Sequence, residues 1–408
     1  MTLLLFTQTY PFGRGEAFIE SELSMLAANW PVTIVPAYGV VGAARAIPDG
    51  VSVDTSLAQR RRPRPPRSSA LGSARRSALA AELRRFGPAL LHPLRAAYAA
   101  HYLHRGGRAA RWLLARRDSP SMILCYWSNA EAFGAALAAR VDPSIRFACR
   151  AHRGDLYEDL APAGYLPFRE EIAARSRVVL AVSDDGRRHL ARRHPDHVER
   201  LVTSRLCLRD GPEPIRRNPR STSPLLASCS TDAPVKRIPL LARTLAELAA
   251  RSPDRRMRWL HVGLETDRLI AALPRNVPPN LEAEGSGWIA PDAIREIWTR
   301  RAPDVFVNLS SSEGVPVSIM EALSVGMPVV ATGAGGTGEL VDEEVGAILP
   351  IDVAAGSAAT AIEAVLARAD ELGPAARRRY LARCSPESVG VEFVEHLRRH
   401  LESPGEKP

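Results

Sequence analysis

Short apolar runs alternate with helix-like stretches along almost the whole chain, and this alternation most narrows the choice of fold. Helix-like stretches occupy residues 16–30, 130–141 and 238–252. Near-continuous apolar strands separated by helices are typical of parallel sheets covered by helices on both faces. We therefore expect an α/β protein built from doubly wound parallel sheets. The expected strands are residues 3–7, 32–38, 122–127, 145–151, 178–183, 201–208, 225–230, 258–263, 304–310, 328–332 and 346–350.

One segment breaks this alternation and predicts a domain boundary. Residues 209–224 contain four prolines and have no apolar period, which is typical of a linker. The sequence thus predicts an N-terminal domain over 1–208, this linker, and a C-terminal domain over 225–408, whose last helix is a candidate to pack back on the N-terminal domain. Two such domains would face each other across a cleft, and ligands of doubly wound sheets bind beyond the carboxyl ends of the strands.

The net charge of +9 is unevenly distributed. Residues 60–117 hold fifteen arginines and one acid, Glu82, a balance of +14 that leaves −5 for the rest. Two interpretations remain open: a solvated basic loop and helix, or a surface for an anionic membrane. Nucleic acid is not expected, because no RNA-recognition, zinc-finger or helix-turn-helix signature occurs.

Cysteine usage and the N-terminus indicate the compartment. The five cysteines are scattered without a Cys-x-x-Cys pair, which predicts buried free thiols in a reducing environment. The apolar run at the N-terminus is too short for a signal peptide, and no stretch approaches the length of a membrane span. We expect a cytoplasmic protein, with the inner face of the membrane as a candidate peripheral location.

Two glutamates eight positions apart, Glu313 and Glu321, mark the most informative stretch. Pro316 suits the first turn of a helix and Gly326 its end, so Glu313 is expected beside a helix N-terminus that attracts anions near Val317. A carboxylate such as Glu313 would repel an anion bound beside it. Its position makes sense if the anion is a diphosphate that carries a sugar and Glu313 binds the sugar hydroxyls, while Glu321 binds the ribose hydroxyls. The alternative is two surface carboxylates. The glycines at 335, 336 and 338 form either a loop for close ligand approach or a plain turn.

Residues 310–341, SSSEGVPVSIMEALSVGMPVVATGAGGTGELV, resemble the signature of retaining family-4 glycosyltransferases (glycosyl transferases group 1) of the GT-B fold. Residues 10–23 and 150–159 are similar to the polysaccharide-biosynthesis branch of that family, and residues 183–190 and 234–241 extend the likeness. The resemblance implies two Rossmann-like domains across a cleft. It also implies a hexosyltransferase that moves a sugar, with retained configuration, from a nucleotide-sugar donor to an acceptor hydroxyl of a glycan, lipid-linked saccharide or natural product.

The resemblance also implies roles for single residues. Glu313 would contact the hydroxyls of the donor sugar, Glu321 the ribose, and Lys236, with Arg237 beside it, the diphosphate, while His152 would face the transferred sugar. Many relatives carry a Gly-Arg pair shortly before the lysine, where this chain has Cys229-Ser230, so one usual cation is missing unless an arginine replaces it. Further donor contacts are implied for Ser312, Gly314, Val315, Pro316, Val317, Gly13 and Gly15, and orienting or acceptor roles for Glu16 and Asp155.

No metal and no further cofactor are expected, because the chain contains no Asp-x-Asp motif and no Cys/His cluster. The leaving diphosphate itself would then take the acceptor proton. Two other function classes stay open: a GT-B-like sugar-nucleotide epimerase or phosphorylase, and a non-catalytic module that binds anionic surfaces. The donor base, the sugar and the acceptor are not specified by these motifs.

Overall fold

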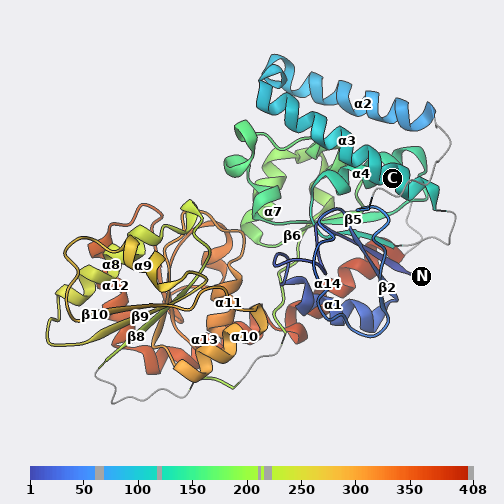
Figure 1. Cartoon of the computed structure of the whole chain (residues 1–408). Coiled ribbons are helices and arrows are strands. Elements are labelled where there is room, and N and C mark those ends of the chain that lie inside the picture. Colours follow the sequence, from blue (N-terminus) through green and yellow to red (C-terminus); the bar gives the residue numbers. More distant parts are fainter. Residues whose placement is uncertain (60–68, 117–121, 210–212, 216–222, 403–408) are drawn as a thin grey trace. The chain divides into compact units, whose positions relative to one another are not determined.

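The computed structural model describes residues 1–59, 69–116, 122–209, 213–215 and 223–402. The chain divides into two compact units. Unit 1 comprises Met1–Arg205 together with Gly390–Pro408, and unit 2 comprises Leu206–Val389. Each unit is a parallel sheet covered by helices, and each is described by itself (Figure 1).

The sheet of unit 1 has, among the described residues, seven parallel strands in the order β3-β2-β1-β4-β5-β6-β7. The strand order reverses between β1 and β4, which pair in parallel from Leu3 opposite Met122 to Phe6 opposite Cys125. Such a reversal leaves room for a ligand beyond the carboxyl ends of the two strands. The strands are β1 (Leu3–Thr7), β2 (Val32–Pro36), β3 (Val51–Val53), β4 (Met122–Cys125), β5 (Phe147–Ala151), β6 (Val178–Ala181) and β7 (Leu201–Thr203).

Helices cover both faces of this sheet because alternate strand residues point to opposite sides. Leu5 packs with α1 (Ile19–Asn29) and α14 (Val391–Leu397), whereas Phe6 packs with α3 (Pro93–Ala115) and α4 (Ala130–Val141). A helical hairpin of α2 (Ser69–Phe86) and α3 lies over α4 (Figure 1). The other helices of unit 1 are α5 (Arg153–Leu156), α6 (Arg169–Arg175) and α7 (Asp184–Arg193).

Unit 2 repeats the same strand order, with six parallel strands described in the order β10-β9-β8-β11-β12-β13. Here the order reverses between β8 and β11. The strands are β8 (Leu225–Cys229), β9 (Met257–Val262), β10 (Leu281–Gly285), β11 (Val305–Asn308), β12 (Val329–Thr332) and β13 (Gly346–Leu349). The helices are α8 (Ile238–Ala250), α9 (Thr266–Ala272) and α12 (Ala355–Leu366) on one face, and α10 (Pro291–Arg301), α11 (Val317–Ser324) and α13 (Ala369–Arg383) on the other.

The predicted α/β architecture with parallel sheets is confirmed, and every expected strand overlaps an observed one. Three expectations need correction. The strands β3 and β10 were not predicted, the helix expected over 16–30 begins only at Ile19, and the strand expected over 201–208 ends at Thr203. The predicted linker lies partly outside the described residues, at 210–212 and 216–222. Within it, Ile215 is buried and its N–H donates to the Val325 carbonyl over 2.9 Å.

All five cysteines are free thiols, as predicted, and four of them are buried. Among the helices of the described residues, none combines the length and the apolar character that crossing a bilayer requires.

Candidate functional site

The strand reversal of unit 2 brings Lys236 and Glu313 together. Lys236 ends a short 3-10 turn that follows β8, and Glu313 lies in the loop that follows β11. Because β8 and β11 are neighbours, both segments leave the sheet at the same edge. A hydrogen bond from the Ser311 N–H to the Val235 carbonyl, 2.8 Å, ties the two segments to each other.

The two side chains form an ion pair. The Lys236 Nζ lies 2.6 Å from the Glu313 Oε1, and the side chains are 24 % and 8 % exposed. Asn308, the last residue of β11, also donates from its Nδ2 to the same oxygen over 3.4 Å. The carboxylate is therefore held in one position, while the ammonium keeps an exposed side on which it can meet a second anion.

A second loop supports the Glu313 loop from behind. The N–H of Gly336 donates to the Gly314 carbonyl over 2.7 Å. Gly335 has φ +55°, and a Cβ built there would lie 2.0 Å from the Glu313 carbonyl oxygen. Glycine at 335 thus allows two protein loops to approach each other closely. The close approach seen at Gly335 is thus to another protein loop, and approach of a ligand to this glycine loop stays a prediction.

Glu321 lies inside α11, is 4 % exposed, and receives no hydrogen bond on its carboxylate from the described residues. Burial raises the pKa of Glu321 to about 8, an effect that the positive charge of Arg295 opposes. The Cys229 thiol at the end of β8 is influenced by the charges of both Glu321 and Lys236, and its pKa is raised chiefly by burial. The thiol is therefore near enough to both charged groups to feel their charges, at a position where the family resemblance implied a glycine.

The helix α11 begins at Val317, directly after Pro316, and Gly326 with φ +73° follows its end, so the sequence prediction for this helix is confirmed. The N–H of Ile319 donates to the Pro316 carbonyl over 3.0 Å, which leaves the N–H groups of Val317 and Ser318 without an acceptor within the helix. Ser312 directly precedes Glu313, and Gly314 and Val315 lie in the loop between Glu313 and this helix start.

Arg237 connects loops of unit 2 through its side chain. Its backbone is left-handed, with φ 48°. Its guanidinium donates to the carbonyls of Leu309 and Ile351, each over 2.6 Å. Arg237 thereby holds the loops after β11 and β13 in place, and a diphosphate contact by Arg237 stays a prediction.

In unit 1, His152 directly follows β5 and is 6 % exposed. Its ring packs against the rings of Trp127, Tyr126 and Phe18, with centroids 4.6, 5.3 and 5.4 Å away. The Nε2 lies 3.1 Å from the Tyr126 carbonyl, and since a carbonyl can only accept, Nε2 carries the proton. Burial, assisted by the nearby Arg150 charge, holds the pKa of His152 well below its usual value. The imidazole is therefore neutral, with its lone pair on Nδ1.

Asp155 ties the ends of β4 and β5 together. Its carboxylate accepts hydrogen bonds from the N–H groups of His152, over 2.6 Å, and Ser128. Burial raises the pKa of Asp155 to about 6 against the lowering effect of Arg169. The Arg169 guanidinium in turn donates to the carbonyls of Ser128 and Asp155. Asp155 therefore fixes the backbone that carries His152.

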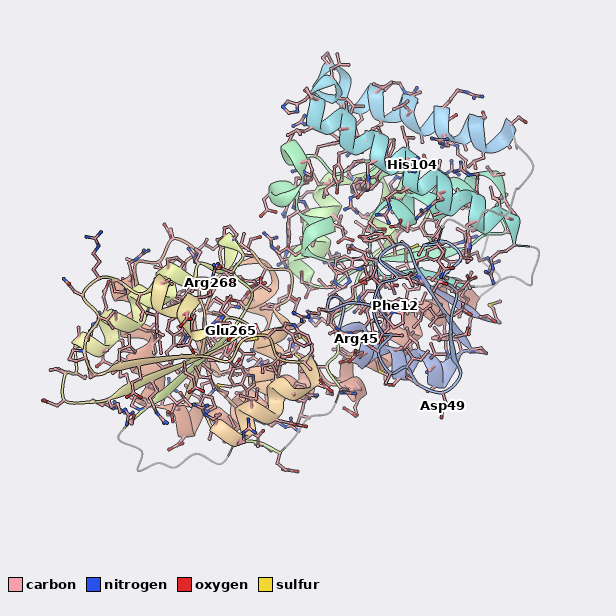
Figure 2. All side chains as sticks on the ribbon, in the orientation of Figure 1. Phe12, Arg45, Asp49, His104, Glu265 and Arg268 are labelled. Carbon is pink, nitrogen blue, oxygen red and sulfur yellow. The ribbon has the colours of Figure 1, made fainter. Side chains whose placement is uncertain are left out.

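Glu16 organises the loop after β1. Its backbone has φ 60°, and its carboxylate accepts from the N–H groups of Gln8, Thr9 and Tyr10 over 2.9, 2.7 and 2.8 Å. The indole Nε1 of Trp127 donates to the same carboxylate over 2.5 Å. The loop so fixed runs through Phe12, labelled in Figure 2, and carries Gly13 and Gly15, where an added Cβ would meet no atom within 4 Å.

The structure thus gathers the predicted residues into two groups, Lys236, Glu313 and Glu321 in unit 2, and Glu16, His152 and Asp155 in unit 1. Sequence reasoning missed the residues that hold them. Position at a strand end could have indicated those that end or follow β4 and β11, but not Arg150, inside β5, or Arg169, at the start of α6. Within the described residues, no group of three or more His, Cys, Asp or Glu side chains could hold a metal ion. The residues missed are Asn308, Tyr126, Trp127, Ser128, Arg150 and Arg169.

A protein-family model matches part of the chain. Residues 224–368, which include Lys236, Glu313 and Glu321, match the family model described as glycosyl transferases group 1. No curated protein matches the chain at a significant level.

Solved structures match far more of the chain. The lipopolysaccharide outer core galactosyltransferase WaaB, in its apo form, is 12 % identical over 97 % of this chain and 99 % of its own, with a TM-score of 0.67. HepE from Anabaena, in complex with UDP and glucose, is 15 % identical over 97 % of this chain and 98 % of its own, with a TM-score of 0.61.

TarM is 18 % identical over 72 % of this chain, with a TM-score of 0.55, and the match spans only 58 % of TarM. At identities this low the likeness shows the fold alone. The fold is GT-B, with two Rossmann-like units, as the sequence resemblance implied.

Proposed function

We propose that this protein is a retaining glycosyltransferase that moves a sugar from a nucleotide-sugar donor to an acceptor hydroxyl. The observation that carries the proposal is the Lys236–Glu313 ion pair at the strand reversal of unit 2, inside the segment that matches glycosyl transferases group 1. A structure of the same fold, HepE, is in complex with UDP and glucose, and this supports a nucleotide sugar as donor.

In this proposal Lys236 binds the diphosphate. Its ammonium is a compact cation with three donors, and only one of them is needed for Glu313. The N–H groups of Val317 and Ser318, at the start of α11, add a second set of donors for the same anion. Positive charge here stabilises the diphosphate as it leaves, when its negative charge increases.

The two glutamates bind two other parts of the donor, the transferred sugar and the ribose. Glu313, held by Lys236 and Asn308, accepts hydrogen bonds from hydroxyls of the transferred sugar. Glu321, buried and without a donor from the described side chains, accepts from the ribose hydroxyls. Because hydroxyl donors favour the ionised carboxylate, nucleotide binding lowers the raised pKa of Glu321 and releases a proton near neutral pH.

His152 serves the transferred sugar. The ring meets the sugar uncharged, because its proton is committed to the Tyr126 carbonyl and its remaining nitrogen accepts from the Asp155 N–H in a capping box. A protonated ring would repel the positive charge that develops on the sugar in an oxocarbenium-like transition state. The low pKa of His152 avoids this repulsion.

The reaction then needs no protein base. The acceptor oxygen forms a bond to the anomeric carbon on the face from which the diphosphate departs. The bond from that carbon to the diphosphate oxygen breaks, and the acceptor proton moves to the departing oxygen. The tasks of the protein are to position the acceptor and to stabilise the leaving group.

One experiment tests the whole proposal. Thermal-shift screening against UDP-, GDP- and ADP-sugars identifies the donor, acceptor trials follow, and NMR of the product gives its anomeric configuration. We expect stabilisation by one nucleotide class and a product with the donor's configuration. An altered sugar formed without acceptor indicates an epimerase, and absence of stabilisation by every nucleotide sugar contradicts the proposal.

Paired variants test the roles of the glutamates. We expect Glu313→Gln to lower turnover and to leave affinity for the free nucleotide largely unchanged, because Glu313 contacts only the sugar. Glu321→Gln should weaken binding of the free nucleotide. Calorimetry of nucleotide binding in buffers of different ionisation enthalpy should show that the wild type releases a proton and that this variant does not. Equal loss of nucleotide affinity in both variants contradicts the division.

A further inference from the structure

The turn between α2 and α3 presents leucines to solvent. Leu83, Leu91 and Leu94 are 43 %, 75 % and 56 % exposed, whereas Leu90 in the same turn is buried and anchors it. The turn itself is a 3-10 segment, Gly87–Leu91, that joins the two helices. Three large apolar side chains within twelve residues form a concentration of exposed apolar surface that a solvated turn does not need.

Cations flank these leucines. Arg76 and Arg84 are exposed, and with Leu83 they lie on one stripe of α2, because positions seven and eight apart share a helix face. Leu83, Leu91, Leu94, Arg76 and Arg84 are called the hairpin tip below.

Most other arginines of the hairpin are engaged within the protein, so the basic segment is not one uniform surface. The guanidinium of Arg85 pairs with Glu170 and that of Arg105 with Glu131. Arg116 pairs with Asp54. The guanidinium groups of Arg95 and Arg108 donate to the carbonyls of Ala163 and Ala37. The charge available to a partner is therefore concentrated near the leucines.

No carboxylate of the hairpin opposes this charge. Glu82 is the only acid between residues 69 and 116, and it is 4 % exposed. Its carboxylate points inward and accepts from the Tyr165 hydroxyl over 2.6 Å and from the Phe168 N–H over 2.9 Å. The described outer surface of the hairpin is thus apolar and positive, a combination that fits an anionic bilayer surface.

We propose that the hairpin tip inserts into the headgroup region of an anionic membrane. The three leucines enter the boundary between headgroups and acyl chains, while Arg76 and Arg84 bind lipid phosphates. A convex turn with leucines at its end and arginines beside them suits a lipid surface better than a protein partner, which would cover the apolar residues with a complementary hollow. This inference does not depend on the proposed sugar transfer.

The test is co-sedimentation of the full chain with phosphatidylcholine vesicles, with and without phosphatidylglycerol, at low and high salt. We expect binding only with phosphatidylglycerol. Arg76→Gln with Arg84→Gln should reduce the partition coefficient about thirtyfold, and Leu91→Ser with Leu94→Ser at least about tenfold. The matched control is Arg378→Gln with Leu381→Ser, an exposed pair three residues apart on α13, which should leave partition unchanged.

Insertion itself is measured with an environment-sensitive dye on Leu91→Cys, compared with Leu381→Cys. We expect a blue shift with anionic vesicles for the first site alone. Unchanged partition in the leucine variant, equal binding to neutral vesicles, or equal dye shifts at both sites overturns the proposal. So does concentration-dependent self-association, seen by sedimentation velocity, that the leucine variant abolishes, because the tip would then be an interface between two copies.

Discussion

Lys236 is one of two lysines in a chain of 52 arginines, and the other, Lys407, lies outside the described residues. The structure gives a reason for a lysine at 236. The ammonium reaches Glu313 over 2.6 Å, while the adjacent Arg237 uses its guanidinium to hold main-chain carbonyls. An ammonium pairs with one carboxylate oxygen and keeps other N–H donors for a second anion. A planar guanidinium would instead use two N–H groups to bind both carboxylate oxygens.

We therefore predict that Lys236→Ala lowers kcat/KM about tenfold to a hundredfold, through loss of one charge-assisted contact to the diphosphate. Lys236→Arg should also lose most activity while the thermal unfolding curve stays unchanged. Steady-state kinetics of the two variants measure this. An arginine variant with wild-type kcat/KM would show that positive charge alone is sufficient.

Glu321 predicts a pH dependence of stability. Its folded-state pKa of about 8 lies above the ordinary value of 4.5, so the folded protein retains a proton that the unfolded chain has lost. The contribution of Glu321 to the free energy of unfolding is fully present at low pH. It decreases as the pH rises between those two pKa values and levels off above about pH 8.

Glu321→Gln removes the titration, so the wild-type melting temperature minus that of the variant should fall steadily from pH 5 to pH 8. Melting curves of both proteins without nucleotide measure it. A difference that does not change with pH contradicts the raised pKa.

At the scale of elements, the loop at 333–339 acts as a support for the Glu313 loop. A Cβ at Gly335 would collide with the Glu313 carbonyl, whereas a Cβ at Gly338 would meet no atom within 4 Å. We predict that Gly335→Ala shifts Glu313 and lowers kcat/KM more than tenfold, although residue 335 is not assigned to substrate binding. Gly338→Ala is the matched control and should be close to wild type. Similar kinetics for the two variants would show that the loop contact does not position Glu313.

The strands also show which parts of the fold could be predicted from the sequence. Buried central strands such as residues 225–229 were predicted because both of their faces are apolar. The edge strand β10 was missed because its buried leucine and partly buried alanine alternate with exposed glutamates, a pattern that resembles a polar loop. The sequence therefore predicted every inner strand and the edge strands β7 and β13, whereas the edge strands β3 and β10 were found only in the structure.

The site residues divide in the same way. Glu313, Glu321 and Lys236 stand at recognisable spacings, so their elements were predictable. The function of Glu16 as an acceptor for three consecutive N–H groups was not, because it depends on a left-handed backbone at a non-glycine residue. The carbonyl contacts of Arg237 depend on how two distant loops fold toward it. Neither pattern is present in local sequence.

At the scale of the whole molecule, unit 1 is assembled from both ends of the described chain. Phe393 and Leu397 of α14 pack with Leu5 and Ile34 of the sheet, and the Phe393 ring lies 4.5 Å from the Arg150 guanidinium carbon. Arg150 is fully buried and paired with Glu22.

We predict that truncation after Val389 unfolds or aggregates unit 1, because it exposes that apolar face and opens a buried ion pair to water. Circular dichroism and solubility of the truncated chain measure this. Phe393→Ala is the milder variant and should cost about 3–5 kcal/mol in chemical denaturation. A soluble truncated chain with cooperative unfolding of both units contradicts the prediction.

Because α14 comes from the end of the chain and packs on the sheet of unit 1, it also determines when unit 1 can complete its folding during translation. After Arg205 leaves the ribosome, all of unit 2 must be synthesised before Gly390 appears, which takes roughly 10–40 s at about 5–20 residues per second. Throughout that interval the nascent sheet carries an uncovered apolar face. Unit 2, which is continuous in sequence, can fold first, so the domain synthesised last completes its fold before the domain synthesised first. The growing chain is therefore a natural client for chaperones that shield apolar surface, and its yield should respond to their abundance more than that of a chain whose domains are each continuous.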